Sequence, residues 1–94
     1  MDLPTLGRIL HYRLRQQDVD AINDRRTGAS LGNQGNPVAV GEVVPLVVLK
    51  VWPNEYGDKP GVNGQALLDG NDTLWVTSAR EGVEPGQWTW PARS

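Results

Sequence analysis

The sequence predicts a small, mostly β domain, and three observations carry that prediction. Eleven glycines and seven prolines in 94 residues favour short strands joined by turns over a bundle of helices. The strongest apolar segment, VVPLVVLKVW at 43–52, has the length and the β-branched content of a buried strand. The length suits one domain, over residues 1–94, and is too short for two.

The first predicted strand covers residues 6–14, because apolar side chains alternate there and a glycine interrupts any helical pattern. Its buried face would carry Leu6, Leu10, Tyr12 and Leu14. A short helix is predicted over residues 17–26. Its acidic side chains lie near the start and its arginines near the end, as the helix dipole favours, and Val19 and Ile22 form a narrow apolar stripe.

Four further strands are predicted after residues 28–37, a glycine-rich segment that we expect to be a mobile loop or an insertion arm. Residues 43–52 form the central strand, and Pro45, which lacks a donor, must lie at an edge, a bulge or the strand entry. After a turn-rich loop at 53–61, residues 62–68 and 73–79 form a hairpin around Asp-Gly-Asn-Asp. Residues 87–90 form a short closing strand.

Five short strands with one helix inserted after the first favour a small barrel over two packed sheets. We therefore predict a five-stranded, SH3-like small barrel. The alternative is an open antiparallel sheet with the helix packed on it.

Composition narrows the function classes. The net charge of −2 and the pI of about 5.2 do not favour nucleic acid as a partner. The absence of cysteine excludes disulfides, thiolate nucleophiles and cysteine-type zinc sites. The N-terminus lacks the pattern of a signal peptide, and the longest apolar run, residues 43–49, is too short to cross a membrane.

No catalytic constellation is legible in the sequence. His11 is the single histidine, and an acid–base or zinc site needs several such groups close together. The acidic turn at 69–72 fails the EF-hand pattern, because the twelfth position from Asp69 is Arg80 and not glutamate. The glycines at 28–35 lack the lysine and the following helix of a phosphate-binding loop. We predict no enzymatic activity, no catalytic residue, no metal and no cofactor.

Binding to a protein partner is better supported, because four of the six aromatic residues are tryptophans. Tryptophans can serve as core plugs or as contact residues, and we expect at least two of the four to lie in the core. The residues predicted to bind a partner or ligand are Arg13, Arg25, Arg26, Trp88 and Trp90.

Four segments together carry a resemblance: TLGRILHYRL, DVDAINDRRT, VNGQALLDGNDTLWVTSAREG and the ending GQWTWP. As a set they resemble a family of small uncharacterised proteins from phages and prophages of actinobacteria. The similarity covers most of the chain, with gaps in the loops at 28–37 and 53–61. One departure is Arg15, where the family pattern would place a Ser or Thr helix cap. The resemblance implies a phage origin and assigns no functional residues.

Two functions remain open at this stage. The first is a non-enzymatic assembly protein of the virion, such as a decoration, head–tail or tail accessory protein, made in the host cytoplasm and bound to other phage proteins or to itself. The alternative is an accessory binder in the host cytoplasm that sequesters a nucleotide-like signal or blocks a host protein. No membrane contact is expected.

Overall fold

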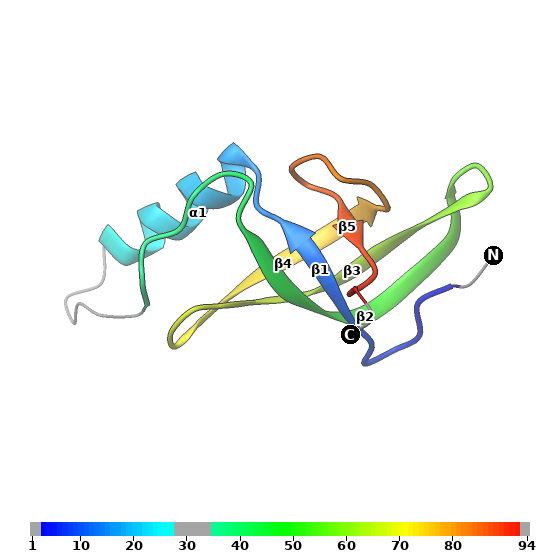
Figure 1. Cartoon of the computed structure of the whole chain (residues 1–94), viewed down its shortest axis with the longest axis horizontal. Coiled ribbons are helices and arrows are strands. Elements are labelled where there is room, and N and C mark those ends of the chain that lie inside the picture. The colour runs from blue at the N-terminus through cyan, green and yellow to red at the C-terminus, as the bar shows by residue number, and fades with distance from the viewer. Residues whose placement is uncertain (1–2, 28–34, 93–94) are drawn as a thin grey trace.

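The computed structural model describes residues 3–27 and 35–92, and within these ranges it contains five strands and one helix. The elements are β1 Ile9–Arg13, α1 Gln16–Thr27, β2 Val43–Tyr56, β3 Lys59–Leu68, β4 Asp72–Arg80 and β5 Trp88–Thr89. Figure 1 shows α1 at one end of an elongated molecule and the β2–β3 turn toward the other end. The predicted number of strands and the helix inserted after the first strand are confirmed.

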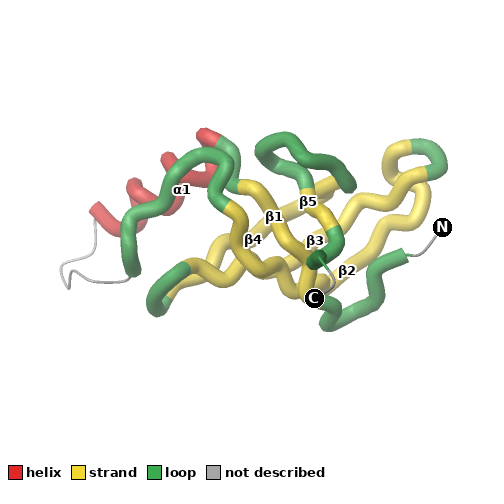
Figure 2. Tube along the Cα trace, viewed as in Figure 1, coloured by secondary structure: helices red, strands yellow, loops and turns green. Residues whose placement is uncertain are grey.

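The strands form one antiparallel sheet in the order β4-β3-β2-β1-β5. Figure 2 shows these strands in yellow. Sequence neighbours β2, β3 and β4 lie side by side, and β1 lies between β2 and the last strand. Pro45 lies in the part of β2 that pairs with β1 alone, because pairing to β3 starts at Leu46. The predicted placement of this proline at a strand entry is therefore confirmed.

The hairpin predicted around Asp69-Gly70-Asn71-Asp72 is confirmed, with Leu68 opposite Asp72 in the register. Gly70 has a φ of 130°, which few residues other than glycine adopt. The turn-rich loop predicted at 53–61 is wrong. β2 continues to Tyr56 and β3 begins at Lys59, with a register shift between Trp52 and Tyr56 that accommodates Pro53.

The sheet is open. The predicted barrel is therefore correct in its number of strands and in the position of the helix, but not in its closure. β5 is two residues long, and one parallel bridge, Glu81 to Trp88, links it to the chain just after β4. The Gly82 amide also donates to the Trp88 carbonyl at 2.9 Å. The two edges of the sheet therefore approach each other without a continuous ladder between them.

The core lies on one face of this curved sheet. Its fully buried side chains come from β1, α1, β2, β3, β4 and β5, and the largest are Trp88, Tyr12, Leu10, Leu14, Ile22 and Leu46. The predicted buried face of the first strand is confirmed at three positions, but Leu6 lies outside β1 and is 70% exposed. The predicted helical stripe of Val19 and Ile22 packs in this core.

Asp18 supplies the helix cap that Arg15 lacks. The Arg15 backbone N–H donates to the Asp18 carboxylate at 2.8 Å, so a side chain in the first turn reaches back to the residue before the helix. α1 then extends from Gln16 to Thr27, one residue longer at each end than predicted. The loop predicted at 28–37 lies mostly outside the described residues. In the described part of this loop, Gly35 forms an isolated β-bridge with Gly70, and the backbone N–H of Asn36 donates to the Asp69 carbonyl at 2.9 Å.

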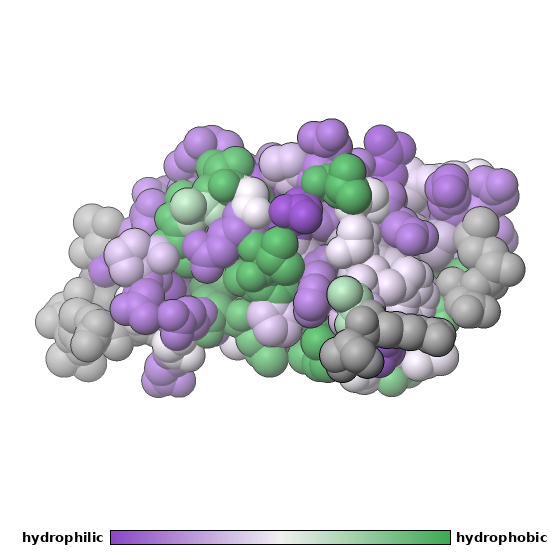
Figure 3. Space-filling view, in the orientation of Figure 1, coloured by the Kyte–Doolittle hydropathy of each residue, from purple (hydrophilic) through white to green (hydrophobic). Residues whose placement is uncertain are grey.

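Several apolar side chains remain exposed on the sheet, and Figure 3 shows a group of them near the centre of the view, where β1 and the first half of β2 lie. The exposed large hydrophobic side chains of the strands are Ile9, Val43, Leu49, Trp52, Tyr56, Leu67 and Trp75. Trp52 and Tyr56 belong to the part of β2 beyond the core, and they lead to the candidate site.

Candidate functional site

Two hollows meet at Ser78 on β4, and we call them together the Ser78 groove. The larger one, about 590 Å³, is lined by Trp52, Pro53, Asn54, Glu55, Asn63 and Ser78. It lies where the last part of β2 turns away from the core. The Trp52 side chain is 43% exposed there, so its ring offers apolar surface to a partner.

The smaller hollow, about 220 Å³, lies on the other side of Ser78 and is more polar. Its lining consists of Tyr12, Arg15, Tyr56, Thr77, Ser78, Arg80, Pro85, Gly86 and Gln87. The groove therefore has an aromatic half, which contains Trp52 and lies mainly on β2, and a cationic half, which contains Arg80 of β4 and Arg15 just before α1.

Ser78 joins the two halves through an unusual backbone conformation. Its φ of 54° is left-handed, which costs a residue with a side chain about 1–2 kcal/mol. Two side chains hold it: the Ser78 N–H donates to Asn63 Oδ1 at 2.8 Å, and the Tyr56 hydroxyl donates to the Ser78 carbonyl. The register shift between Val62 and Gly64 accommodates this bend in the ladder.

Arg80 is the open cation of the groove. Its guanidinium lies 5.7 Å from the centre of the Tyr56 ring, in a cation–π contact. Within residues 3–27 and 35–92, no carboxylate lies at ion-pair distance from it. A guanidinium with planar donors and no carboxylate at ion-pair distance is suited to bind a carboxylate or a phosphate.

Arg15 forms the opposite side of the polar hollow and is tied to Asp18. Its Nε and Nη2 atoms donate to the two Asp18 oxygens at 3.2 and 2.9 Å. Asp18 also accepts a hydrogen bond from the buried Tyr12 hydroxyl at 2.6 Å. This cluster holds the start of α1 against the sheet and fixes where the Arg15 guanidinium lies.

The cluster shifts the pKa of each member. Burial alone would raise the pKa of Asp18, but hydrogen bonds from Arg15 and Tyr12 outweigh it and hold that pKa below the ordinary value. Burial, and then the hydrogen bond to Asp18, raise the pKa of Tyr12, and the bond to Asp18 raises the pKa of Arg15. Asp18 is thus a carboxylate held in its charged form.

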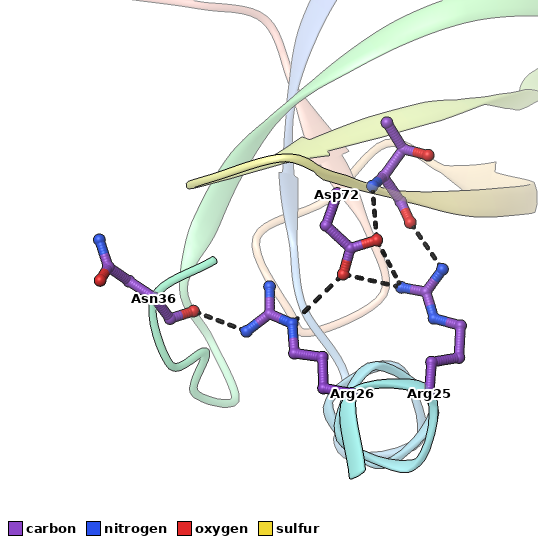
Figure 4. Close-up of polar contacts among 5 residues, drawn as sticks. Arg25, Arg26, Asn36 and Asp72 are labelled. Atoms are coloured by element: carbon purple, nitrogen blue, oxygen red, sulfur yellow. Dashed lines mark hydrogen bonds and ion pairs between the residues drawn. The ribbon is translucent and has the colours of Figure 1, made fainter. Parts of the chain in front are cut away.

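Arg25 and Arg26, both predicted to bind a partner or ligand, come together at Asp72, as Figure 4 shows. Arg25 also donates to the Thr73 carbonyl at 2.9 Å, and Arg26 to the Asn36 carbonyl at 2.7 Å. The Arg26 Nη2 atom is buried and has no hydrogen-bond partner in the described part of the chain. The pair thus joins the end of α1 to the start of β4.

The other three predicted binding residues lie apart from this pair. Arg13 donates from Nη1 to the Gly41 carbonyl at 3.4 Å. Trp88 is fully buried, and its indole N–H donates to the Ala79 carbonyl at 3.0 Å. Trp90 is half-buried against the core, edge-on to Trp88 at 5.6 Å, and Arg8 covers its ring. A surface partner can reach Trp90 but not Trp88. Of the four tryptophans only Trp88 is fully buried, so the expectation of at least two core tryptophans is met only if the half-buried Trp90 is counted.

His11 lies on β1 between Pro45 and Thr89, with two strands separating it from Asp72 on β4. Across the described ranges, no three side chains of His, Asp or Glu gather in a way that could hold a metal ion. No helix in those ranges has the length and apolar character needed to cross a membrane.

The groove residues Tyr56, Ser78 and Arg80 were missed by sequence reasoning. Trp52 was noted among the aromatic residues, and Lys50, which ends the apolar run and lies over the Trp52 ring at 4.9 Å, was the available signal that this strand leaves the core. Nothing in the local sequence indicates that Ser78 bends the backbone, since serine rarely adopts a positive φ.

Comparisons with protein-family models, with curated proteins and with solved structures find no match to this chain. The resemblance to a phage protein family therefore stays a prediction from the sequence.

Proposed function

We propose that this chain is a non-enzymatic assembly protein of a phage particle, a decoration, head–tail or tail accessory protein that binds another phage protein through the Ser78 groove. The observation that carries the proposal is the groove itself: an open hollow of about 590 Å³ lined by Trp52, beside the Arg80 guanidinium, which forms no ion pair within the described residues. Tryptophan, tyrosine and arginine are the residue types that dominate protein–protein contact energies.

The alternative function, a cytoplasmic binder of a nucleotide-like signal, depends on Arg25 and Arg26 as phosphate ligands. Both guanidinium groups instead donate to oxygens of the chain itself, at Asp72, Thr73 and Asn36. Recruiting them to a phosphate would break contacts that join α1 to the sheet. This favours the assembly protein over the nucleotide binder.

We also propose that the open sheet is an SH3-like small barrel split between β4 and β5. The strand order, with β1 between β2 and β5, and the bridge from Glu81 to Trp88 support this. Fold alone assigns no partner, so this proposal adds nothing to the functional one. An experimental structure with β4 and β5 far apart, at the ends of a flat sheet, would contradict it.

Mass spectrometry of purified virions tests the proposed function. Particles of a phage that encodes this chain should contain it in an amount comparable to the known structural proteins of the same particle. An early, non-structural protein of that phage serves as the control for contamination. Finding the chain only in the infected cell, with none in the particles, would contradict the proposal.

A further inference from the structure

The two halves of the Ser78 groove offer different chemistry to one ligand. The aromatic half presents the Trp52 ring and Pro53, and the polar half presents Arg80 and the Thr77 side chain. Because both hollows are lined by Ser78, a ligand in one half is adjacent to the other. A matching ligand therefore carries an apolar group next to a negative charge.

The polar half has capacity for an anion that the protein does not use. Arg80 makes its described contact with the Tyr56 ring and none with a carboxylate. Arg15 is engaged with Asp18 through Nε and Nη2, and its Nη1 makes no hydrogen bond within the described residues. Among the described lining residues of the two hollows, Glu55 is the one acidic residue, and it belongs to the aromatic half.

The backbone of β4 adds a feature that a peptide can use. β4 is an edge strand, so alternate residues direct their N–H and C=O groups away from β3. Arg25 donates to the Thr73 carbonyl at 2.9 Å and the Trp88 indole donates to the Ala79 carbonyl at 3.0 Å, so these two positions are covered. Between them, Trp75 shares the outward register of Thr73. Thr77 lies at the register shift, has no partner in the β3–β4 register, and lines the polar hollow.

We propose that the Ser78 groove binds an extended acidic peptide segment of the protein partner. Its backbone would pair with the free edge of β4 at Thr77, its carboxylate would bind Arg80 between Arg15 and Tyr56, and a neighbouring apolar side chain would fill the hollow beside Trp52. This inference rests on the proposed function as a protein-binding module. It adds the chemical class of the segment that is bound.

A peptide fits these observations better than a nucleic acid does. A strand of phosphates needs several cations along its path, whereas Arg15 and Arg80 are the only two among the described residues that line this groove, and Arg15 is neutralised in part by Asp18. A nucleotide also cannot continue the hydrogen-bond ladder of an edge strand, which is how extended peptides add to sheets.

Selection from a surface-displayed library of short random peptides, with the purified chain as bait, tests the inference. We expect the selected peptides to be enriched in Asp or Glu within two positions of an aromatic, proline or leucine side chain. Selection of peptides without acidic residues would overturn the inference, and so would a selection with no enrichment above background.

Affinity measurements on one selected peptide, made fluorescent, locate the contact. Arg80→Gln should weaken binding by about tenfold or more, the range for losing a hydrogen bond to a charged group. Trp52→Ala should weaken it by a similar factor. Two variants outside the lining of the groove are the matched controls. Arg8→Gln removes a positive charge just before β1, and Leu6→Ala removes an apolar group that is 70% exposed.

The exposed positions of Arg80 and Trp52 mean that both variants should fold, and thermal melts of each verify it. Equal affinities for Arg80→Gln and the unaltered chain would overturn the inference. A single-stranded oligonucleotide that displaces the peptide at physiological salt would also overturn it, by assigning the groove to nucleic acid.

The inference and the proposed function can fail separately. If virions contain the chain but no acidic peptide is selected, the assembly role stands and the assignment of the groove falls. If acidic peptides bind through Arg80 but virions lack the chain, the groove is assigned and the partner lies outside the particle.

Discussion

The junction around Asp72 and the groove around Ser78 contain the same residue types in opposite states. At the junction, Arg25 and Arg26 share one carboxylate, and the Arg26 side chain is only 15% exposed. In the groove, Arg80 has an aromatic ring beside it and no carboxylate, and Trp52 is 43% exposed. One end of β4 is thus fixed to the helix, and the other is left open.

An arginine is available to a partner only where the fold has not already supplied its acceptor. The two adjacent arginines of the helix looked like the better anion site in the sequence, but Asp72 comes close to them across 46 and 47 positions of chain. Arg80 is isolated in the sequence, and the structure leaves it free to pair with an anion.

Replacing Trp88 with alanine should have the largest effect on stability, because it removes a fully buried side chain. The side chain is fully buried and its indole N–H bonds to Ala79, so the loss should be about 3–5 kcal/mol of unfolding free energy. The matched variant Trp52→Ala should lose less than about 1 kcal/mol. Urea unfolding measures both, and equal losses would erase the distinction between the two tryptophans.

Replacing Asp72 with alanine should destabilise the junction by about 2–3 kcal/mol, because two guanidinium groups lose their shared acceptor and one of them is mostly buried. Asp58, in the exposed β2–β3 turn, is the control, and Asp58→Ala should change stability by less than about 0.5 kcal/mol. Among single arginine variants, Arg26→Ala should cost more than the better-exposed Arg25→Ala. If Arg25→Ala cost more than Arg26→Ala, the exposed ion pair of Arg25 with Asp72 would contribute more to stability than the mostly buried pair of Arg26.

Acid should weaken the protein through Asp18. The folded-state pKa of this carboxyl is held below its unfolded value, so its contribution is present above the unfolded pKa, which is about 3.9, and is lost as the pH falls through the folded pKa. Asp18→Asn should lower stability at neutral pH and flatten the decline below about pH 4. Unfolding curves over this pH range measure the effect, and identical pH profiles for the two proteins would remove Asp18 as its source.

Replacing Arg80 with glutamine should leave the unfolding free energy within about 0.5 kcal/mol of the starting protein, since no described carboxylate or carbonyl depends on it. Peptide binding should nevertheless fall. A variant that keeps its stability but loses peptide binding is what we expect of a residue that the fold leaves free for a partner. A large loss of stability would mean that the Tyr56 contact is structural and that the groove resembles the junction after all.

Local patterns predicted the elements well. The Asp-Gly turn, the alternation of Leu10, Tyr12 and Leu14, and the apolar run at 43–52 each depend on neighbours in the sequence, and each appears in the structure. The strand continuing through Pro53 was not predicted, because the register shift that tolerates a proline depends on pairing with β3. The predicted barrel does not close, because β5 is joined to the chain after β4 by one bridge and not by a ladder.

The site was harder to predict because it is made by distant partners. Arg25, Arg26 and Trp88 were selected as binding residues from their types, and only the folded chain brings them to Asp72 and Ala79. The left-handed backbone of Ser78 depends on Asn63 and Tyr56, which lie 15 and 22 positions away. No pattern within one segment carries that information.

The two-residue strand β5 has a consequence for synthesis. Trp88 fills the core beside β1, yet it is translated after β1, β2, β3 and β4. Contacts between segments that lie far apart in a chain form slowly, because a long loop must close first. A nascent chain paused before position 88 therefore exposes Leu10 and Leu46 to solvent and to chaperones, and a stop codon just before that position should yield an aggregating product instead of a shortened domain.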